Sequence, residues 1–253
     1  MTFGAYKKVY ILDWFKNWFD SFYYHKLYRH RNTEEAKKFI DNIIDYIQPS
    51  RESRILDLAC GKGRHSIYLN SKGFDVVGVD LSQNSIDIAN QSANERLHFH
   101  QMDMRQLSCD QPFNMVVNFF TSFGYFKHRS ENMDVLHGVS RILNPKGILV
   151  IDFLNATKVI RDLVPEEIQN VDGIQFVINR FVENDTVVKT IEVTDQDKKL
   201  NFEERVSMFE LKDFKEMLHE AGLNLLNHFG DYELNPFHPE SSDRLILIAQ
   251  KQG

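Results

Sequence analysis

The sequence is poor in cysteine and in long apolar runs, and each shortage excludes a class of protein. Only two of the 253 residues are cysteines, Cys60 and Cys109, and neither belongs to a CxxC pair or a cluster with histidine. We therefore expect no disulfide framework and no metal site, as in a reduced, cytoplasmic protein. No run of about 18 apolar residues occurs, so no membrane-spanning helix is predicted.

The chain also lacks an excess of positive charge. Its formal net charge is −6, so no global basic field would attract DNA or an anionic membrane. A local basic patch can still exist, which leaves RNA open as a partner. The length suits one large α/β domain that buries its own core.

Short apolar runs alternate with helical patterns in the first 155 residues. Apolar positions at helical spacing predict a helix over 32–47. Buried strands are predicted at 54–59, 74–80, 97–103, 113–119 and 148–154, with helical stretches between most of them. This βαβ rhythm predicts a parallel sheet that is covered by helices on both faces.

The rhythm changes after Asn155. Three strand-like runs at 173–183, 186–194 and 199–209 are separated by polar turns, which predicts an antiparallel β-meander. A helix over 210–222 and strands at 223–229 and 244–250 then return to the first pattern. We expect a core domain of residues 32–155 and 207–253 that carries an inserted meander at 156–206.

Two glycines, Gly61 and Gly63, stand where the first strand passes into its helix. Glycine permits a tight turn and lets a ligand approach the backbone beyond the carboxyl end of a parallel strand. Asp80 closes the second strand and follows Gly61 by 19 residues. This spacing suits a carboxylate that binds a ribose diol. A dinucleotide motif would need a third glycine where Ser66 stands, and no Walker A loop occurs. An adenosine-type cofactor without a diphosphate is therefore predicted.

These residues resemble a known family. DLACGKG (57–63) resembles motif I of the class I S-adenosylmethionine (SAM)-dependent methyltransferases, with Ala59 in place of the first glycine. Segments similar to the family's later motifs follow in the family's order: VVGVDLS (76–82), QMDMR (101–105), FNMVVNFFTSFGYF (113–126) and LNPKGILVIDF (143–153). The resemblance implies a Rossmann-like α/β fold with a seven-stranded, mostly parallel sheet of order 3-2-1-4-5-7-6, its last strand antiparallel.

The resemblance also implies roles for single residues in binding SAM, which leaves as S-adenosylhomocysteine. Asp57 and the backbone of Ala59, Cys60, Gly61 and Gly63 would hold the methionine part. Asp80 would bind the ribose, with Leu81 beside the adenine. Asp103 would accept a hydrogen bond from the adenine amine between Met102 and Met104. Asn118 and Phe119 would lie beside the sulfonium. Arg64 either pairs with the cofactor's carboxylate or faces solvent.

The first 31 residues hold eleven of the chain's 31 aromatic residues. A packing helix explains Trp14, Trp18 and Phe22, which share one helical face. In similar enzymes the segment before the first core helix folds over the cofactor as a lid. This would place Tyr24 and Tyr28 at the cofactor. The candidates for a general base are His25 in this lid and Tyr125 after the fourth strand.

The fourth strand indicates the acceptor class. Enzymes that methylate the exocyclic amines of nucleic-acid bases carry two prolines and an aromatic residue after this strand. This chain has Asn118, Phe119, Phe120 and Thr121 there instead. TSFGYF (121–126) looks like the loop of small-molecule methyltransferases, in which a meander covers the substrate or joins two subunits as a homodimer. We expect methyl transfer to nitrogen or oxygen of a small molecule by in-line displacement. An RNA- or tRNA-modifying methyltransferase and a non-catalytic SAM-binding module remain alternatives.

Overall fold

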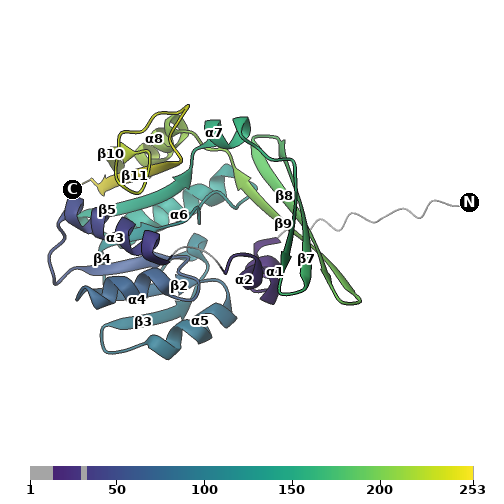
Figure 1. Ribbon diagram of the computed structural model, residues 1–253. Helices are drawn as coiled ribbons and strands as arrows, with labels where there is room; N and C mark the ends of the chain where they lie inside the picture. Colours follow the sequence, from purple (N-terminus) through teal and green to yellow (C-terminus); the bar gives the residue numbers. More distant parts are fainter. Residues whose placement is uncertain (1–13, 30–32, 253) are drawn as a thin grey trace, which may run out of the picture.

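A seven-stranded sheet forms the centre of the molecule (Figure 1). The computed structural model describes residues 14–29 and 33–252. The strands of the sheet are β1 (Arg54–Leu58), β2 (Asp75–Asp80), β3 (Leu97–Gln101), β4 (Phe113–Asn118), β5 (Leu143–Leu154), β10 (Leu223–Phe229) and β11 (Arg244–Lys251). Their order is β3-β2-β1-β4-β5-β11-β10, and β11 runs antiparallel to both of its neighbours. The predicted order 3-2-1-4-5-7-6 is confirmed.

Helices cover both faces of this sheet. One face packs against α3 (Thr33–Ile47), α4 (Arg64–Ser71) and α5 (Gln83–Ala89), and the other against α6 (Arg129–Ile142) and α8 (Leu211–Glu220). Successive strand residues alternate between the two cores: Ile55 joins the α3–α5 side, and Leu56 the α6–α8 side. Burial on both faces explains why the central strands, such as β1, β4 and β11, are rich in consecutive apolar residues.

Three short elements connect these helices and strands. They are η1 (Asn90–Ser92), η2 (Met104–Gln106) and α7 (Ala156–Arg161). The fifth strand was predicted at 148–154, but β5 begins at Leu143 and includes the preceding NPKG sequence. Lys146 has a φ of 63° there, which marks an irregularity inside the strand.

A second sheet is antiparallel and contains four strands, one more than the sequence predicted. They are β6 (Glu166–Val171), β7 (Ile174–Glu183), β8 (Thr186–Asp195) and β9 (Lys198–Ser207). Asn184 and Asp185 both have positive φ, the geometry that two-residue hairpin turns require. Asp172 and Gly173 repeat it between β6 and β7, the hairpin that the prediction missed.

Two short helices, α1 (Trp14–Phe19) and α2 (Phe22–Leu27), lie between the two sheets (Figure 1). Trp18 is fully buried, and its Nε1 donates to Glu204 Oε1 on β9 at 2.6 Å. Tyr28 Oη donates to the same oxygen at 2.8 Å. These contacts fasten the described part of the N-terminal segment to the meander; residues 1–13 and 30–31 of that segment lie outside the described residues. Across residues 14–29 and 33–252, no helix has the length and apolar character needed to cross a membrane.

Candidate active site

A cavity of about 890 Å³ opens where β1, β2, β3 and β4 end at their carboxyl edge. Such a volume lies within the ordinary range for small-molecule sites. The segments that follow these strands form one side, and α1 and α2 form the other. Of the predicted site residues, the lining contains Ala59, Cys60, Gly61, Arg64, Asp80, Leu81, Met102, Asp103, Met104, Phe119, Tyr125, Tyr24, His25 and Tyr28.

The turn after β1 is held in a left-handed conformation. Ala59, Gly61 and Gly63 have φ values of 62°, 54° and 79°. A Cβ built on Gly61 would meet no atom within 4 Å, so this glycine leaves open space at the cavity wall. A Cβ on Gly63 would lie 2.7 Å from the ring of Phe99. Gly61 therefore leaves room for a ligand, whereas Gly63 permits close packing beneath the turn.

Asp80 links this turn to the end of β2. Its Oδ2 accepts from the Gly61 amide at 2.8 Å, and its Oδ1 from the Ser82 amide at 2.9 Å. Burial raises the pKa of this carboxyl, and the backbone bonds from Ser82 and Gly61 oppose the rise. Each oxygen keeps a further acceptor site, which suits the two hydroxyls of a ribose.

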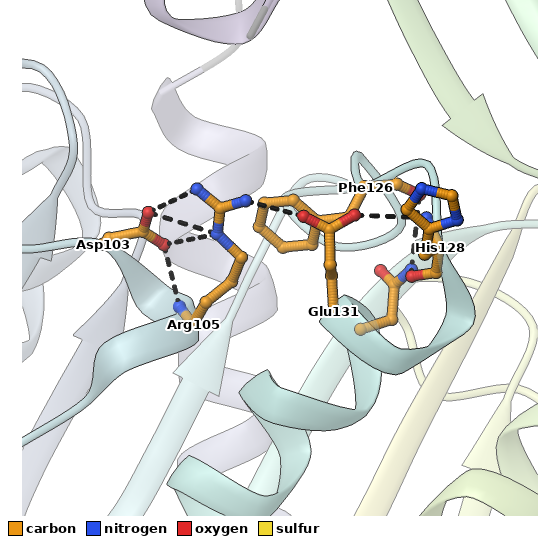
Figure 2. Close-up of polar contacts among 6 residues, drawn as sticks. Asp103, Arg105, Phe126, His128 and Glu131 are labelled. Atoms are coloured by element: carbon orange, nitrogen blue, oxygen red, sulfur yellow. Dashed lines mark hydrogen bonds and ion pairs between the residues drawn. The ribbon is translucent and has the colours of Figure 1, made fainter. Parts of the chain in front are cut away.

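Asp103 is bound on both oxygens by Arg105 (Figure 2). Oδ1 also accepts from the Arg105 amide at 2.9 Å, and the guanidinium contacts Glu131 Oε1 at 2.8 Å and lies over the Phe126 ring. Burial alone would raise the pKa of Asp103, but the bonds from Arg105 outweigh it and hold the pKa below its ordinary value. An adenine amine would have to share this carboxylate with Arg105, so its predicted role stays a prediction.

Three residues that were expected at the cofactor lie outside the cavity lining: Asp57, Gly63 and Asn118. Asp57 is 1 % exposed and accepts from Ser66 Oγ at 2.6 Å. This contact gives Ser66 a role that the sequence did not reveal. Asn118 Nδ2 donates to the Leu58 carbonyl at 2.9 Å, while its buried Oδ1 has no hydrogen-bond partner among the described residues. Their predicted contacts with the cofactor remain untested.

Burial raises the pKa of Asp57 from 3.8 to about 6. Between these values the folded state holds a proton that the unfolded chain releases, so stability falls as pH rises through this window. The cost is fully present above pH 6 and reaches at most about 3 kcal/mol.

Asp57→Asn removes the titration. We measure the unfolding free energy in urea without cofactor. The difference between this variant and wild type should shift in favour of the variant between pH 4 and pH 7, by up to about 3 kcal/mol. The surface variant Asp87→Asn is the control, and a difference that is independent of pH would contradict this prediction.

Four aromatic rings along the cavity form a continuous chain of contacts, the aromatic wall: Phe19, Tyr24, Tyr28 and Tyr125. The ring centroids of Tyr24 and Tyr28 are 5.0 Å apart, those of Phe19 and Tyr24 5.0 Å, and those of Phe19 and Tyr125 5.2 Å. The Tyr125 hydroxyl donates to the Thr121 carbonyl. Its proton is thus engaged by the backbone, and a base role for Tyr125 or for His25 stays a prediction.

The cavity also contains residues that the sequence analysis did not name as site residues. The Phe120 ring stacks on His65 at 5.1 Å and 14°, and the Arg64 guanidinium lies 4.7 Å from the same ring. Arg64 is therefore at the cavity. Asp20, between α1 and α2, accepts from Ser82 Oγ and Asn84 Nδ2, which fastens the N-terminal segment to the end of β2. The motifs do not predict these contacts, because the partners are distant in the sequence, as His65 and Phe120 or Asp20 and Ser82 are.

Comparison with known proteins agrees with this arrangement. Residues 55–147 match the family described as "Methyltransferase domain". "Putative methyltransferase YqeM" of Bacillus subtilis is 30 % identical over 90 % of this chain and 94 % of its own length. A glycine/sarcosine N-methyltransferase of Aphanothece halophytica is 26 % identical over 97 % of this chain and 91 % of its own.

A solved structure shares the fold. The SAM-dependent methyltransferase from Clostridium acetobutylicum superposes with a TM-score of 0.79 at 21 % identity, covering 91 % of this chain and 97 % of that one. The overall likeness to YqeM, the matching domain and the sheet order all agree with the motifs at the strand ends. The chain belongs to the class I SAM-dependent methyltransferases.

Proposed function

We propose that the protein transfers a methyl group from SAM to the nitrogen of a small amine. The observation that carries the proposal is the aromatic wall, which lines the cavity beside the turn after β4. Aromatic faces attract ammonium and sulfonium groups, by about 0.5–2 kcal/mol each. An amine gains alkyl substituents and retains positive charge when it is methylated, so this wall suits both the acceptor and its product.

The residues present suit SAM. Gly61 leaves space for a ligand at the turn, Asp80 offers two fixed carboxylate oxygens, and Met102 and Met104 flank Asp103 in the lining. We assign these residues to the cofactor. SAM supplies a methyl group that its sulfonium already activates.

The protein's contribution is then positioning and exclusion of water. The segment of α1 and α2 encloses the cavity from the side opposite the strand ends. Holding two reactants in line can contribute about 7–11 kcal/mol of barrier reduction. His25 lies in the lining and is our candidate for taking the proton from the amine. The relative that acts on glycine and sarcosine supports a small amine as acceptor.

The proposal is tested with methyl-labelled SAM and matched acceptors. Glycine, sarcosine and an amino sugar are each paired with the corresponding hydroxy compound, and bulk tRNA forms a further sample. We expect labelled product from at least one amine and none from its hydroxy partner, detected by mass spectrometry. Label in the tRNA alone would replace the proposal with an RNA-modifying activity. SAM binding without transfer to any sample would favour a non-catalytic module.

A substitution of Tyr24 tests the aromatic wall. Tyr24→Phe keeps the ring, and we expect near-native kcat/KM for the amine. Tyr24→Leu removes it, and we expect kcat/KM to fall by about 5- to 30-fold, the equivalent of 1–2 kcal/mol of lost cation–π attraction. Phe22, on the same helix but 59 % exposed and outside the lining, supplies the control Phe22→Leu. Equal losses in Tyr24→Leu and Phe22→Leu would contradict a role of the wall in binding.

A further inference from the structure

The turn after β4 contains two consecutive residues in an unfavourable backbone conformation. Phe120 and Thr121 both have a φ of 58°. Side chains other than glycine rarely adopt this left-handed region, and a β-branched residue such as Thr121 is a clear outlier there. Such strain persists only where the surrounding structure holds it, and it is frequent at active sites.

An ion pair between the buried Asp152 and the partly buried Arg244 holds these two residues. Asp152 on β5 is fully buried, and its Oδ2 accepts from the Phe120 amide at 2.8 Å, while its backbone carbonyl accepts from the Thr121 amide at 2.9 Å. Arg244 on β11 donates through Nε to Asp152 Oδ1 at 2.7 Å and through a terminal nitrogen to Thr121 Oγ1 at 2.8 Å. The Tyr232 hydroxyl also donates to Asp152 Oδ2, at 3.2 Å. Both strained residues thus have direct contacts with this pair.

The turn carries groups that face the cavity. Phe119, Phe120, Ser122 and Tyr125 all belong to the lining. The Tyr125 hydroxyl donates to the Thr121 carbonyl, so the conformation of Thr121 fixes the Tyr125 ring of the aromatic wall. Ser122 Oγ donates to the Phe119 carbonyl at 2.9 Å. A change at Thr121 would therefore move several parts of the acceptor side together.

We propose that Asp152 and Arg244 are positioning residues that hold the turn at Phe120–Thr121 in its strained conformation and so place the acceptor beside the methyl donor. The inference rests on the proposed function for its effect on turnover. Its structural part, the restraint of the turn, is independent of any acceptor. Neither residue belongs to the cavity lining, so both act through the turn.

Asp152→Asn tests the pair. The carboxylate accepts from the Phe120 amide, the Tyr232 hydroxyl and Arg244 Nε, whereas an amide has only one acceptor oxygen and directs its N–H₂ group at the donors on its other side. We expect hydrogen exchange of the Phe120 amide, which bonds the side-chain carboxylate, to accelerate on the order of tenfold, with the other strands of the sheet unchanged. For an amine that wild type methylates, kcat should fall on the order of 10- to 100-fold, as a small misplacement can cause. SAM affinity should stay within about threefold of wild type, since Gly61 and Asp80 are untouched.

A rescue variant separates positioning from general stability. Asn adopts the left-handed region more readily than Thr and keeps a side-chain acceptor for Arg244. In the Asp152→Asn background, Thr121→Asn should restore the slower exchange at Phe120 and at least about a third of the lost kcat. Loss of thermal stability with kcat unchanged, or loss of SAM affinity equal to the loss of kcat/KM, would overturn the assignment.

A milder variant keeps the test decisive where Asp152→Asn does not fold. Tyr232→Phe removes one bond to Asp152 and leaves the ion pair in place. Tyr68 Oη donates to Asp41 at 2.8 Å outside the cavity lining, so Tyr68→Phe is the matched control. We expect faster exchange at Phe120 in the first variant only; equal behaviour would contradict the proposal. If wild type methylates no amine, the proposed function fails, and the exchange data alone decide the restraint of the turn.

Discussion

Gly61→Ala is expected to bind SAM on the order of 100-fold more weakly than wild type while remaining folded. The reason is local: a Cβ at this position would meet no protein atom within 4 Å and would project into the space that we assign to the cofactor. Forcing a methyl group against a well-fitted neighbour costs about 1–3 kcal/mol, or roughly 5- to 150-fold in affinity. Calorimetric titration measures the effect.

Gly73→Ala is the matched control for this variant. Gly73 also has positive φ, 96°, and its Cβ would likewise meet nothing within 4 Å, but the residue lies after α4, outside the cavity lining. Both variants should therefore lose stability through backbone strain, Gly73→Ala at least as much as Gly61→Ala, because a φ of 96° lies outside the left-handed region that alanine can adopt. Only Gly61→Ala should lose affinity. Similar dissociation constants in the two variants would show that the cofactor does not approach Gly61.

Asp80→Ala should have an effect at least as large. It removes the proposed partner of the ribose and leaves the amides of Gly61 and Ser82 without their acceptor. Hydrogen bonds to charged groups contribute about 1.5–3 kcal/mol each, so we expect the loss of both ribose bonds to lower SAM affinity by at least about 100-fold. The measurement is again calorimetric titration with SAM and S-adenosylhomocysteine.

The other end of the same strand supplies the control for Asp80. Asp75 begins β2, contacts Arg54 Nε at 3.6 Å, and lies outside the cavity lining. Asp75→Ala should bind SAM like wild type. Native SAM affinity in Asp80→Ala would contradict the assignment of Asp80 to the ribose.

The central sheet was predictable from the sequence because its signals are local. Most of its buried strands are short apolar runs, and most of these runs are followed by a helical pattern. The prediction of the meander was less complete, because EEIQNV, which forms β6, is largely polar and resembles a loop. The missed hairpin nevertheless had a local signal, because Asp172-Gly173 between Val171 and Ile174 is a typical two-residue turn sequence.

The position of the cavity was predictable, since the carboxyl ends of parallel strands meet at one edge. The contacts that organise it were not. Asp152 and Arg244 are 92 positions apart, and Trp18 and Glu204 are 186 apart. No periodicity links such pairs. Gly63 illustrates a different limit: the pattern shows that glycine stands at the turn, but only the Phe99 ring shows that packing requires it.

The central claim is that the cavity beyond β1 and β2 is the SAM site. The most direct test is calorimetric titration of the native protein with SAM, S-adenosylhomocysteine and NAD, repeated on Gly61→Ala. We expect micromolar binding of the two sulfur ligands, none of NAD, and strong weakening in the variant. SAM at about 100 times its dissociation constant should also stabilise the native fold by roughly 2.7 kcal/mol. Native affinity in Gly61→Ala, or no binding of either sulfur ligand to the native protein, would contradict the account.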